Sequence, residues 1–567
     1  MKISFNWIKE LLNQNLTIDE TSDLLTDIGL EVEGIEDYNS APQTDLSQLI
    51  IGQITKCEKH PNADKLKLTE VDIGGKKLNI ICGAPNVETN QKVVVAKVGS
   101  TLYTNKNEKI KIKKAKIRGI ESHGMIVSEF EIGLSNNHQG IINLDNNLKI
   151  GGNYSKIIKP YRDKIFEIGI TPNRSDALSH YGVARDLRAA ISHRNKIKID
   201  LITPSISNYT TQGINTSLTI NIVDSLACKR FCGLVIKNIS ISNSHPDILN
   251  KLTAIGVKPI NNVVDITNYV MFDLNRPLHA YDADKINKEI IVRNSLEGEE
   301  FKALDDKTYK LKKNMCVIAD KKNILGLGGI IGGTTTSTEI DTKNILLESA
   351  YFFPTSIRKS ARLLNISTDA KYRFERGIDP NSITDGLRSA ADLIIKICGG
   401  TASKFLITGQ TSNKRKVISF KTSEFKNLIG ITISDNEVMK ILKSLGFLIK
   451  RNKELFKAEV PSWRPDINEV VDIVEELIRI KGFKHIQTID PEKKREKETL
   501  NFSQKLFHLS QRALASKGYF EAVTWSFTDS KIDNLFSNDQ KELNIFNPIS
   551  TDLNVLRRSI LSNLAIY

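Results

Sequence analysis

Apolar and polar positions over the first forty residues follow the spacing of helices. Apolar residues recur three and four positions apart over residues 5–12 and again over 18–28, which places them on one face of a helix. Gly29 follows the second run and accepts the left-handed conformation that ends many helices. We therefore expect a helical N-terminal segment over residues 1–39.

From Ile50 onward the pattern changes to short runs broken by Gly, Asn and Pro. Runs such as IIGQIT, KLNIIC, KVVVAKVG and KIKIKKAKIRG continue to about Gly152. Regular short strands with turn residues between them are typical of a small barrel. We expect this barrel to occupy residues 40–152.

Helical and strand patterns alternate over the rest of the chain, and the sequence predicts a multidomain α+β protein. Helices are expected over 176–192 and 382–397 and from about Ile467 and Phe502. After the barrel, the expected parts are a helical connector (153–212), an α/β domain (213–385), a small α/β domain (408–486), a charged linker (487–500) and an antiparallel-sheet domain (500–567). The last residues, RRSILSNLAIY, stop within an apolar helical pattern, which favours a chain cut short at its C-terminal end.

Composition and charge narrow the class of protein. Hydrophobic residues make up 40% and charged residues 26%, as in soluble globular proteins, so we expect a cytoplasmic protein. The six cysteines form no CxxC pair, and neither a zinc site nor a disulfide framework is expected. The net charge of +14 favours a polyanionic partner, because neutralising phosphates releases counterions. A genome biased toward Lys, Asn and Ile explains the charge equally well.

A basic stretch in the barrel carries the first candidate function. Lys109, Lys111 and Lys113 alternate with Ile110 and Ile112, so one face of the strand is basic and the other apolar. Such a face either binds nucleic-acid phosphates or belongs to a solvated edge strand, where lysines discourage aggregation. The full predicted RNA-binding set is Lys109, Lys111, Lys113, Lys114, Lys116 and Arg118, expected in one hairpin with Lys106.

A resemblance decides between these alternatives. The segments IGQITKCEKHPNADKLKLTEVDI, ICGAPNV and IRGIESHGMIVSEFEIGL resemble the tRNA-binding OB-fold of several aminoacyl-tRNA synthetases and of stand-alone tRNA-binding factors. HPNADKL is a highly specific part of this match. The resemblance implies that the basic face binds tRNA.

The α/β domain resembles a hydrolytic domain. Its segments NNVVDITNYVMFDLNRPLHAYDA, ILGLGGIIGG and ILLESAYFFPTSIRKSARLLNISTDAKYRFER resemble the editing domain of the β subunit of bacterial phenylalanyl-tRNA synthetase. The resemblance implies hydrolysis of tyrosine wrongly esterified to the phenylalanine tRNA. Matching positions give the candidate editing residues His279, Glu348, Thr267, Asn268, Gly328 and Gly329.

Residue chemistry leaves the roles of these editing candidates open. A pocket that accepts tyrosine needs a buried acceptor for its hydroxyl, and Glu348 is the candidate. Glu348 could instead pair with Arg358 or Arg362, and His279 could be structural. The glycine-rich run fits neither a P-loop nor a dinucleotide fingerprint, and no GxSxG elbow is present.

An acidic segment near residue 470 is a candidate metal site. Asp472, Glu475 and Glu476 are spaced to lie on one face of a helix, and carboxylate oxygens are ligands that Mg²⁺ prefers. The same residues also fit helix capping and a solvated acidic face. In the family, the segment PSWRxD…D..EE supplies a magnesium site near the α subunit, which implies the ligands Asp466, Asp472, Glu475 and Glu476.

Four matches in the family's order imply the function of a synthetase β subunit. The segment from Phe502 resembles the start of its class II synthetase-like domain, which is inactive and packs against the α subunit. The expected assembly is an α2β2 tetramer that charges tRNA(Phe), with ATP and phenylalanine bound by α and editing carried out by this chain. Two alternatives are a free-standing tRNA-editing hydrolase and a non-enzymatic tRNA-binding protein.

Overall fold

The computed structural model divides into two compact units, Met1–Gln487 and Thr488–Tyr567. It describes residues 1–42, 44–104, 106, 108–134, 140–203, 214, 216–411, 414–491, 500–537 and 541–566. Residues 204–212 of the expected connector and 492–499 of the expected linker lie outside the described residues. No helix in the described ranges is long and apolar enough to cross a bilayer.

The N-terminal segment contains strands as well as the two expected helices. The helices are α1 (Phe5–Leu12) and α2 (Ile18–Asp27), and Gly29 follows α2 at φ +86°. The strands form an antiparallel sheet of order β1-β13-β2, with bounds Lys2–Ser4, Arg162–Gly169 and Glu31–Asn39. The expectation of a helical segment is therefore incomplete: its two helices are present, but β1 and β2 were not predicted, because their partner β13 lies far away in the sequence.

A curled sheet forms the expected barrel. Its order is β11-β6-β3-β4-β5, with β12 beside β6. The strands are β3 (Leu49–Lys59), β4 (Lys67–Asp72), β5 (Lys77–Cys82), β6 (Lys92–Lys97), β11 (Gly124–Ile126) and β12 (Asn143–Leu144). The backbone N–H of His123, next to β11, donates to the carbonyl of Asn79 in β5 at 2.8 Å. This bond brings the two ends of the sheet together, so the barrel is nearly closed.

The basic stretch forms two short hairpins where we expected one. β7 (Thr101–Tyr103) pairs with β8 (Lys109–Lys111), and β9 (Ala115–Ile117) pairs with β10 (Ile120–Ser122). The predicted alternation holds across Ile112, which is buried between exposed lysines.

Two sheets pack around a shared hydrophobic core in the middle of the first unit. One has the order β16-β23-β15-β24 with β25 beside β15, and the other the order β14-β17-β20-β21-β22. The first contains His279–Asp282, Asn344–Phe352, Cys228–Lys237, Thr401–Ala402 and Leu406–Gly409, in the order named. The second contains Thr219–Ile222, Glu289–Asn294, Cys316–Ala319, Ile324–Leu327 and Ile331–Gly332. A small hairpin pairs β18 (Glu300–Lys302) with β19 (Thr308–Lys310).

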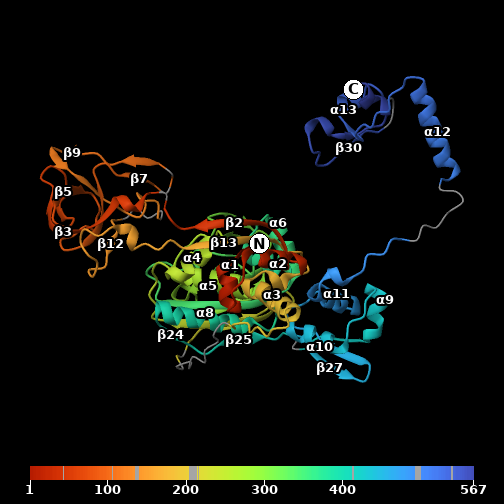
Figure 1. Cartoon of the computed structure of the whole chain (residues 1–567), viewed down its shortest axis with the longest axis horizontal. Coiled ribbons are helices and arrows are strands. Elements are labelled where there is room, and N and C mark those ends of the chain that lie inside the picture. Colours follow the sequence, from red (N-terminus) through yellow and green to blue (C-terminus); the bar gives the residue numbers. More distant parts are fainter. Residues whose placement is uncertain are drawn as a thin grey trace. The chain divides into compact units, whose positions relative to one another are not determined.

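Helices surround these sheets, and α5 and α8 lie side by side (Figure 1). They are α3 (His180–Arg194), α4 (Pro246–Ala254), α5 (Asn262–Leu274), α6 (Pro354–Leu364), α7 (Asp369–Phe374) and α8 (Ile383–Cys398). Trp7 of α1, Leu187 of α3 and Leu387 of α8 belong to one continuous buried cluster. The helices therefore share a core with the N-terminal segment.

The small α/β domain contributes to the same core. Its antiparallel sheet has the order β26-β28-β27, with bounds Val417–Phe420, Leu455–Glu459 and Leu448–Asn452. Its helices are α9 (Phe425–Ile429), α10 (Asp435–Ser444) and α11 (Val470–Lys481). Phe420 and Leu477 join the buried cluster that contains Trp7.

A chain of buried ion pairs joins α11 to α3. Glu476 accepts from Arg464 Nη1 at 2.5 Å and from Arg479 Nε at 2.7 Å. Arg479 also donates to Asp186 of α3 at 2.9 Å, and Asp186 in turn accepts from Arg174 at 2.6 Å. Burial alone would raise the pKa of Glu476, but the two arginines hold that pKa well below its usual value.

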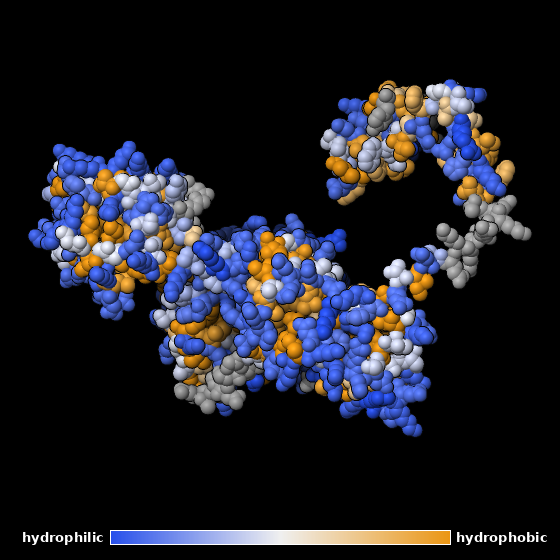
Figure 2. All heavy atoms as spheres, viewed as in Figure 1, coloured by the Kyte–Doolittle hydropathy of each residue, from blue (hydrophilic) through white to orange (hydrophobic). Residues whose placement is uncertain are grey.

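The second unit, Thr488–Tyr567, is small and has a sparse core. It contains α12 (Phe502–Ser516), α13 (Ser530–Asp533) and α14 (Ile560–Leu564), with a sheet of order β29-β31-β30 formed by Phe527–Thr528, Val555–Leu556 and Leu543–Asn544. Among the described residues of this unit, Val555 is the one hydrophobic residue that is fully buried. Many of its apolar side chains lie on the surface (Figure 2).

We expect Glu476→Gln to destabilise the first unit by about 3–5 kcal/mol, because it leaves two buried guanidinium groups without their shared charge. Denaturant unfolding of the full chain measures the effect. Glu475→Gln, on the exposed neighbour, is the matched control and should cost little. Because the folded pKa of Glu476 is depressed, its stabilisation is present above the unfolded value of ~4.3 and is lost as the pH falls. Equal unfolding midpoints for the two variants would contradict this account.

Candidate functional site

Pairing between two strands brings three candidate side chains to one face of a sheet. β16 pairs with β23 so that His279 lies directly opposite Glu348. Side chains alternate along a strand, so Tyr281 projects from the same face as His279. The two rings meet edge to face, with centroids 4.4 Å apart. The sequence analysis missed Tyr281, although its position two residues after His279 signals a shared face.

These residues line a cavity of about 90 Å³. His279, Tyr281 and Glu348 form one wall, and Gly329 and Gly332 belong to another. Gly329 has φ +68°, a conformation that glycine adopts without strain. Its backbone N–H makes no hydrogen bond to another described residue.

Glu348 is a buried carboxyl group held by its own chain. Tyr281 Oη donates to Glu348 Oε2 at 2.5 Å. Burial raises the pKa of Glu348 to about 7, and the hydrogen bond from Tyr281 acts in the opposite direction. Among the described residues no ion pair joins Glu348 to Arg358 or Arg362, so the alternative of a structural salt bridge is not supported; Arg358 donates to the carbonyl of Glu375.

His279 is a neutral imidazole at physiological pH. Burial lowers the pKa of His279 to about 4. Its Nε2 has no hydrogen-bond partner among the described residues. A Cβ atom on Gly332 would stand 2.6 Å from this nitrogen, so a glycine is needed there to leave room for the ring.

The other predicted editing residues lie outside the lining of this cavity. Thr267 and Asn268 belong to α5, and the Thr267 hydroxyl donates to Val264 of its own helix at 2.7 Å. A Cβ atom on Gly328 would lie 2.8 Å from the Phe352 ring, so a side chain of the hydrophobic core packs closely against the backbone at Gly328. The packing of Phe352 therefore gives a structural reason for this glycine.

The predicted tRNA-binding cations of the barrel all lie exposed. They are Lys109, Lys111, Lys113, Lys114, Lys116 and Arg118. Lys114 pairs with Glu121 at 2.8 Å, and both side chains are about half exposed. Exposed ion pairs contribute little to stability, so these cations remain available to a polyanion.

The four predicted magnesium ligands do not form a ligand set in this chain. Glu476 is occupied by two arginines, and Arg464 Nη2 also donates to Asp466 at 2.8 Å. Asp472 accepts the backbone N–H groups of Asn468 and Glu469 at the start of α11, while Glu475 is exposed. The described residues contain no group of three or more His, Cys, Asp or Glu side chains that could hold a metal. The prediction of Mg²⁺ at Asp466, Asp472, Glu475 and Glu476 therefore does not fit the geometry of this chain by itself.

Comparisons with known proteins identify the family. Models described as a tRNA binding domain, a B3/4 domain, a tRNA synthetase B5 domain and a phenylalanyl tRNA synthetase beta chain CLM domain match residues 49–153, 227–399, 418–483 and 486–566. The phenylalanine--tRNA ligase beta subunit of Bartonella henselae is 38% identical over 569 residues, covering 100% of this chain and 69% of that protein. The chain belongs to the family of phenylalanine--tRNA ligase beta subunits.

Other members of the phenylalanine--tRNA ligase beta subunit family match this chain over a similar length. The beta subunit of Fusobacterium nucleatum is 39% identical over 567 residues, again covering 100% of this chain and 69% of the relative. An N-terminal fragment of the beta subunit from Pyrococcus horikoshii covers 85% of this chain at 13% identity, with a TM-score of 0.38 that is too low to support an inference. The His279–Glu348 cavity lies within the B3/4 match, and the basic hairpins lie within the tRNA binding match.

We expect Tyr281→Phe to raise the pKa of Glu348 above about 7, because the lost hydrogen bond lowers that pKa in the wild type. Carboxyl ¹³C NMR of glutamate-labelled protein measures the titration, with Glu348→Gln to assign the signal. Tyr309→Phe is the matched control, since Tyr309 hydrogen-bonds a different carboxylate, Asp305. A signal for Glu348 that titrates at the same pH in wild type and Tyr281→Phe would contradict the role of this bond.

Proposed function

We propose that this chain hydrolyses tyrosine misattached to tRNA(Phe), at the cavity between His279 and Glu348. The observation that carries the proposal is a buried carboxyl group beside a neutral imidazole on one sheet face, within a segment that matches the B3/4 domain. Glu348 would accept the tyrosine hydroxyl, which a phenylalanine side chain lacks. A buried acceptor left unpaired is costly, so such a site favours tyrosine.

Hydrolysis at this cavity would use water as the nucleophile. His279 would position the water through its neutral ring, and the backbone N–H of Gly329, which has no partner among the described residues, would donate to the developing oxyanion. Thr267, Asn268 and Gly328 are proposed to act from outside the cavity lining.

The barrel is proposed to hold the tRNA by electrostatic attraction. The six predicted cations, which are all exposed, lie on and beside two short hairpins, within the match to the tRNA binding domain. Few aromatic side chains accompany them, so contacts with phosphates would contribute more than stacking on bases.

The second unit is proposed to pack against an α subunit, which would bind ATP and phenylalanine and complete an α2β2 tetramer. Phe520, Val523, Phe546 and Ile549 are almost fully exposed, and their neighbours in this unit add further apolar surface (Figure 2). Exposed apolar patches of this kind mark interfaces between proteins. A magnesium ion would need ligands from the partner, because Asp472 and Glu476 of α11 are engaged within this chain.

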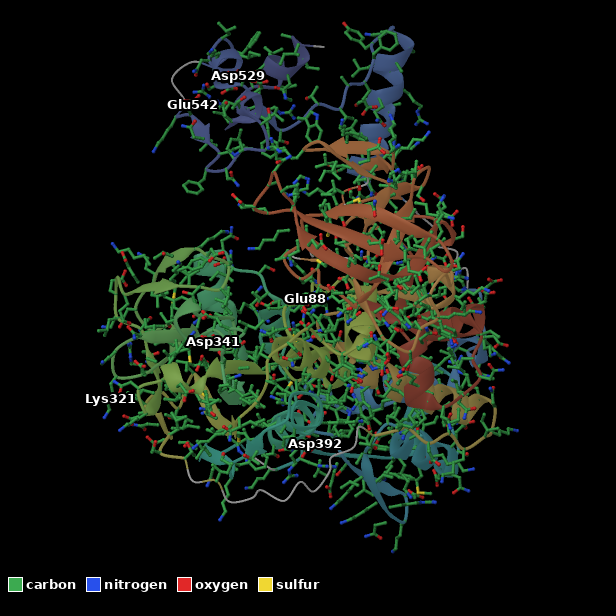
Figure 3. All side chains as sticks on the ribbon, turned by 90° about the vertical axis from the view of Figure 1, so that its left-hand side faces the viewer. Glu88, Lys321, Asp341, Asp392, Asp529 and Glu542 are labelled. Carbon is green, nitrogen blue, oxygen red and sulfur yellow. The ribbon has the colours of Figure 1, made fainter. Side chains whose placement is uncertain are left out.

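The test is deacylation of Tyr-tRNA(Phe) and Phe-tRNA(Phe) by the full chain, with and without added α subunit. We expect Glu348→Ala to reduce the preference for Tyr-tRNA(Phe) by about tenfold or more, because the hydroxyl loses its acceptor. Asp341→Asn is the matched control: Asp341 is an exposed carboxylate of the same segment (Figure 3). Hydrolysis by the chain alone would favour the free-standing hydrolase, and no hydrolysis under either condition would leave a tRNA-binding protein.

A second variant tests the barrel. Replacing Lys109, Lys111 and Lys113 by Gln should weaken tRNA binding and flatten its salt dependence, with a slope smaller by up to about 0.7–0.9 for each phosphate that the variant no longer neutralises. Filter binding at several salt concentrations measures both effects. Replacing Lys321, Lys322 and Lys343 by Gln removes the same charge from exposed positions outside the barrel. If this control weakened binding as much as the barrel variant, the basic face would have no special role.

A further inference from the structure

A second and larger cavity lies within the first unit, away from the residues of the proposed editing site. Its volume is about 450 Å³, within the range of small-molecule sites. Its walls come from α3, the turn after α5, the start of α8 and the region of α10 and Trp463. Those elements belong to different sequence segments, and ligand sites are common at such junctions. None of the six predicted editing residues lines it.

Arg276, in its wall, is a buried cation whose hydrogen bonds to the described residues go to neutral groups, although the charges of Asp379 and Asp385 also act on it. Its side chain has no exposed surface. It donates to Ser382 Oγ at 2.6 Å, to the Ala350 carbonyl at 3.2 Å and to the Asp379 carbonyl. Burial lowers the pKa of Arg276 to about 10. A buried charge without an ionic hydrogen bond is unfavourable, so this wall favours a negative charge nearby.

Arg185 adds a second cation whose compensation is weak. Its guanidinium lies 4.5 Å from the centre of the Trp463 ring. Among the described residues its carboxylate contact is Asp176, at 3.4 Å. Asp176 is shared with Arg174, from which it accepts at 2.9 Å, and the charge of Asp186 also acts on Arg185.

The charges of the whole wall leave an excess of cations. Arg188 and Lys443 also line the cavity, and Arg188 donates to the Ser444 carbonyl. The lining thus contains four cations against three carboxylates, which are Asp176, Asp379 and Asp385. Asp385 interacts with Arg388 at 3.6 Å, which further reduces the negative charge available to the wall.

The start of α8 adds to this positive character. Its N-cap residue, Ser382, makes no capping hydrogen bond, because its hydroxyl oxygen accepts from Arg276. The first N–H groups of a helix then attract an anion, in the same direction as the helix dipole. Leu201, Leu274 and the Trp463 ring provide an apolar wall beside these charges.

We propose that this cavity binds a small organic anion, with a carboxylate or phosphate group toward Arg185 and an apolar portion against Trp463 and Leu201. The anion compensates the cations that the protein leaves underpaired, and the apolar portion displaces water from the indole and the leucines. This site is separate from aminoacyl-tRNA editing and does not depend on it.

Isothermal titration of the full chain tests the proposal with four probes: 3-phenylpropionate, phenyl phosphate, inorganic phosphate and the neutral 3-phenylpropionamide. We expect a Kd below ~1 mM for at least one organic anion, and binding of the amide at least tenfold weaker. The tighter of the two organic anions assigns the head group. Saturable binding of inorganic phosphate alone, equal binding of acid and amide, or no saturable binding of any probe would overturn the proposal.

Three variants place the binding in this cavity. Arg185→Gln should weaken the better probe at least tenfold, Leu201→Trp should abolish its binding by filling the apolar wall, and Lys443→Gln should weaken it more modestly. Lys440→Gln, an exposed position of α10 outside the lining, is the matched control and should bind as the wild type does. If Arg185→Gln does not fold, Leu201→Trp and Lys443→Gln decide. Unchanged affinity in the folded variants would assign the ligand to another place and overturn the proposal.

Discussion

The buried ion pairs that run from Arg464 through Glu476 and Arg479 to Asp186 are the constraint on which the first unit depends. Their side chains are almost fully enclosed, with exposed fractions of 2–5%. Hydrophobic packing alone has no preferred direction, whereas paired guanidinium and carboxylate groups bind in a fixed geometry. These pairs therefore hold α11 and α3 in one relative orientation. Arg185 and Trp463 both line the larger cavity and contact each other. Their relative position therefore depends on that orientation.

The parts of the fold that could be predicted from the sequence are those set by local signals, whereas the ion-pair network and the strand pairing depend on residues far apart in the chain. The bounds of α1 agree with the sequence, and α8 begins one residue later than expected, because helix periodicity and end residues are local signals. The strands β1 and β2 were missed, since their partner β13 lies far along the chain. Spacing correctly placed Asp472 and Glu476 on one helix. It could not reveal that Glu476 is buried and bound by Arg464 from outside the helix and by Arg479 three residues further along it, so the spacing alone did not distinguish a metal site from an ion-pair network.

The residues of the candidate site were likewise predicted only in part. Sequence resemblance pointed to His279 and Glu348, and the register of β16 against β23 places them opposite each other. Tyr281 was missed because its importance comes from a hydrogen bond to a residue on a different strand. Thr267, in the helix before β16, was predicted by its place in a motif, yet its hydroxyl is used within its own helix. A motif identifies a neighbourhood in the fold, but strand register and burial decide which of its side chains meet.

Burial also limits the chemistry that this neighbourhood can perform. It lowers the pKa of His279 to about 4 and raises that of Glu348 to about 7, so both groups shift toward their neutral forms and do not form an ion pair. Cys316 lies near the glycine-rich turn, but burial raises the pKa of its thiol far above neutrality, and a protonated thiol is a poor nucleophile. A neutral imidazole, a carboxyl group that changes charge near pH 7 and a Gly329 N–H without a partner among the described residues would instead suit the proposed reaction, in which water attacks an ester. The weakly charged cavity would then select its substrate by one hydroxyl group, while attraction of the tRNA phosphates is left to the lysines of the barrel.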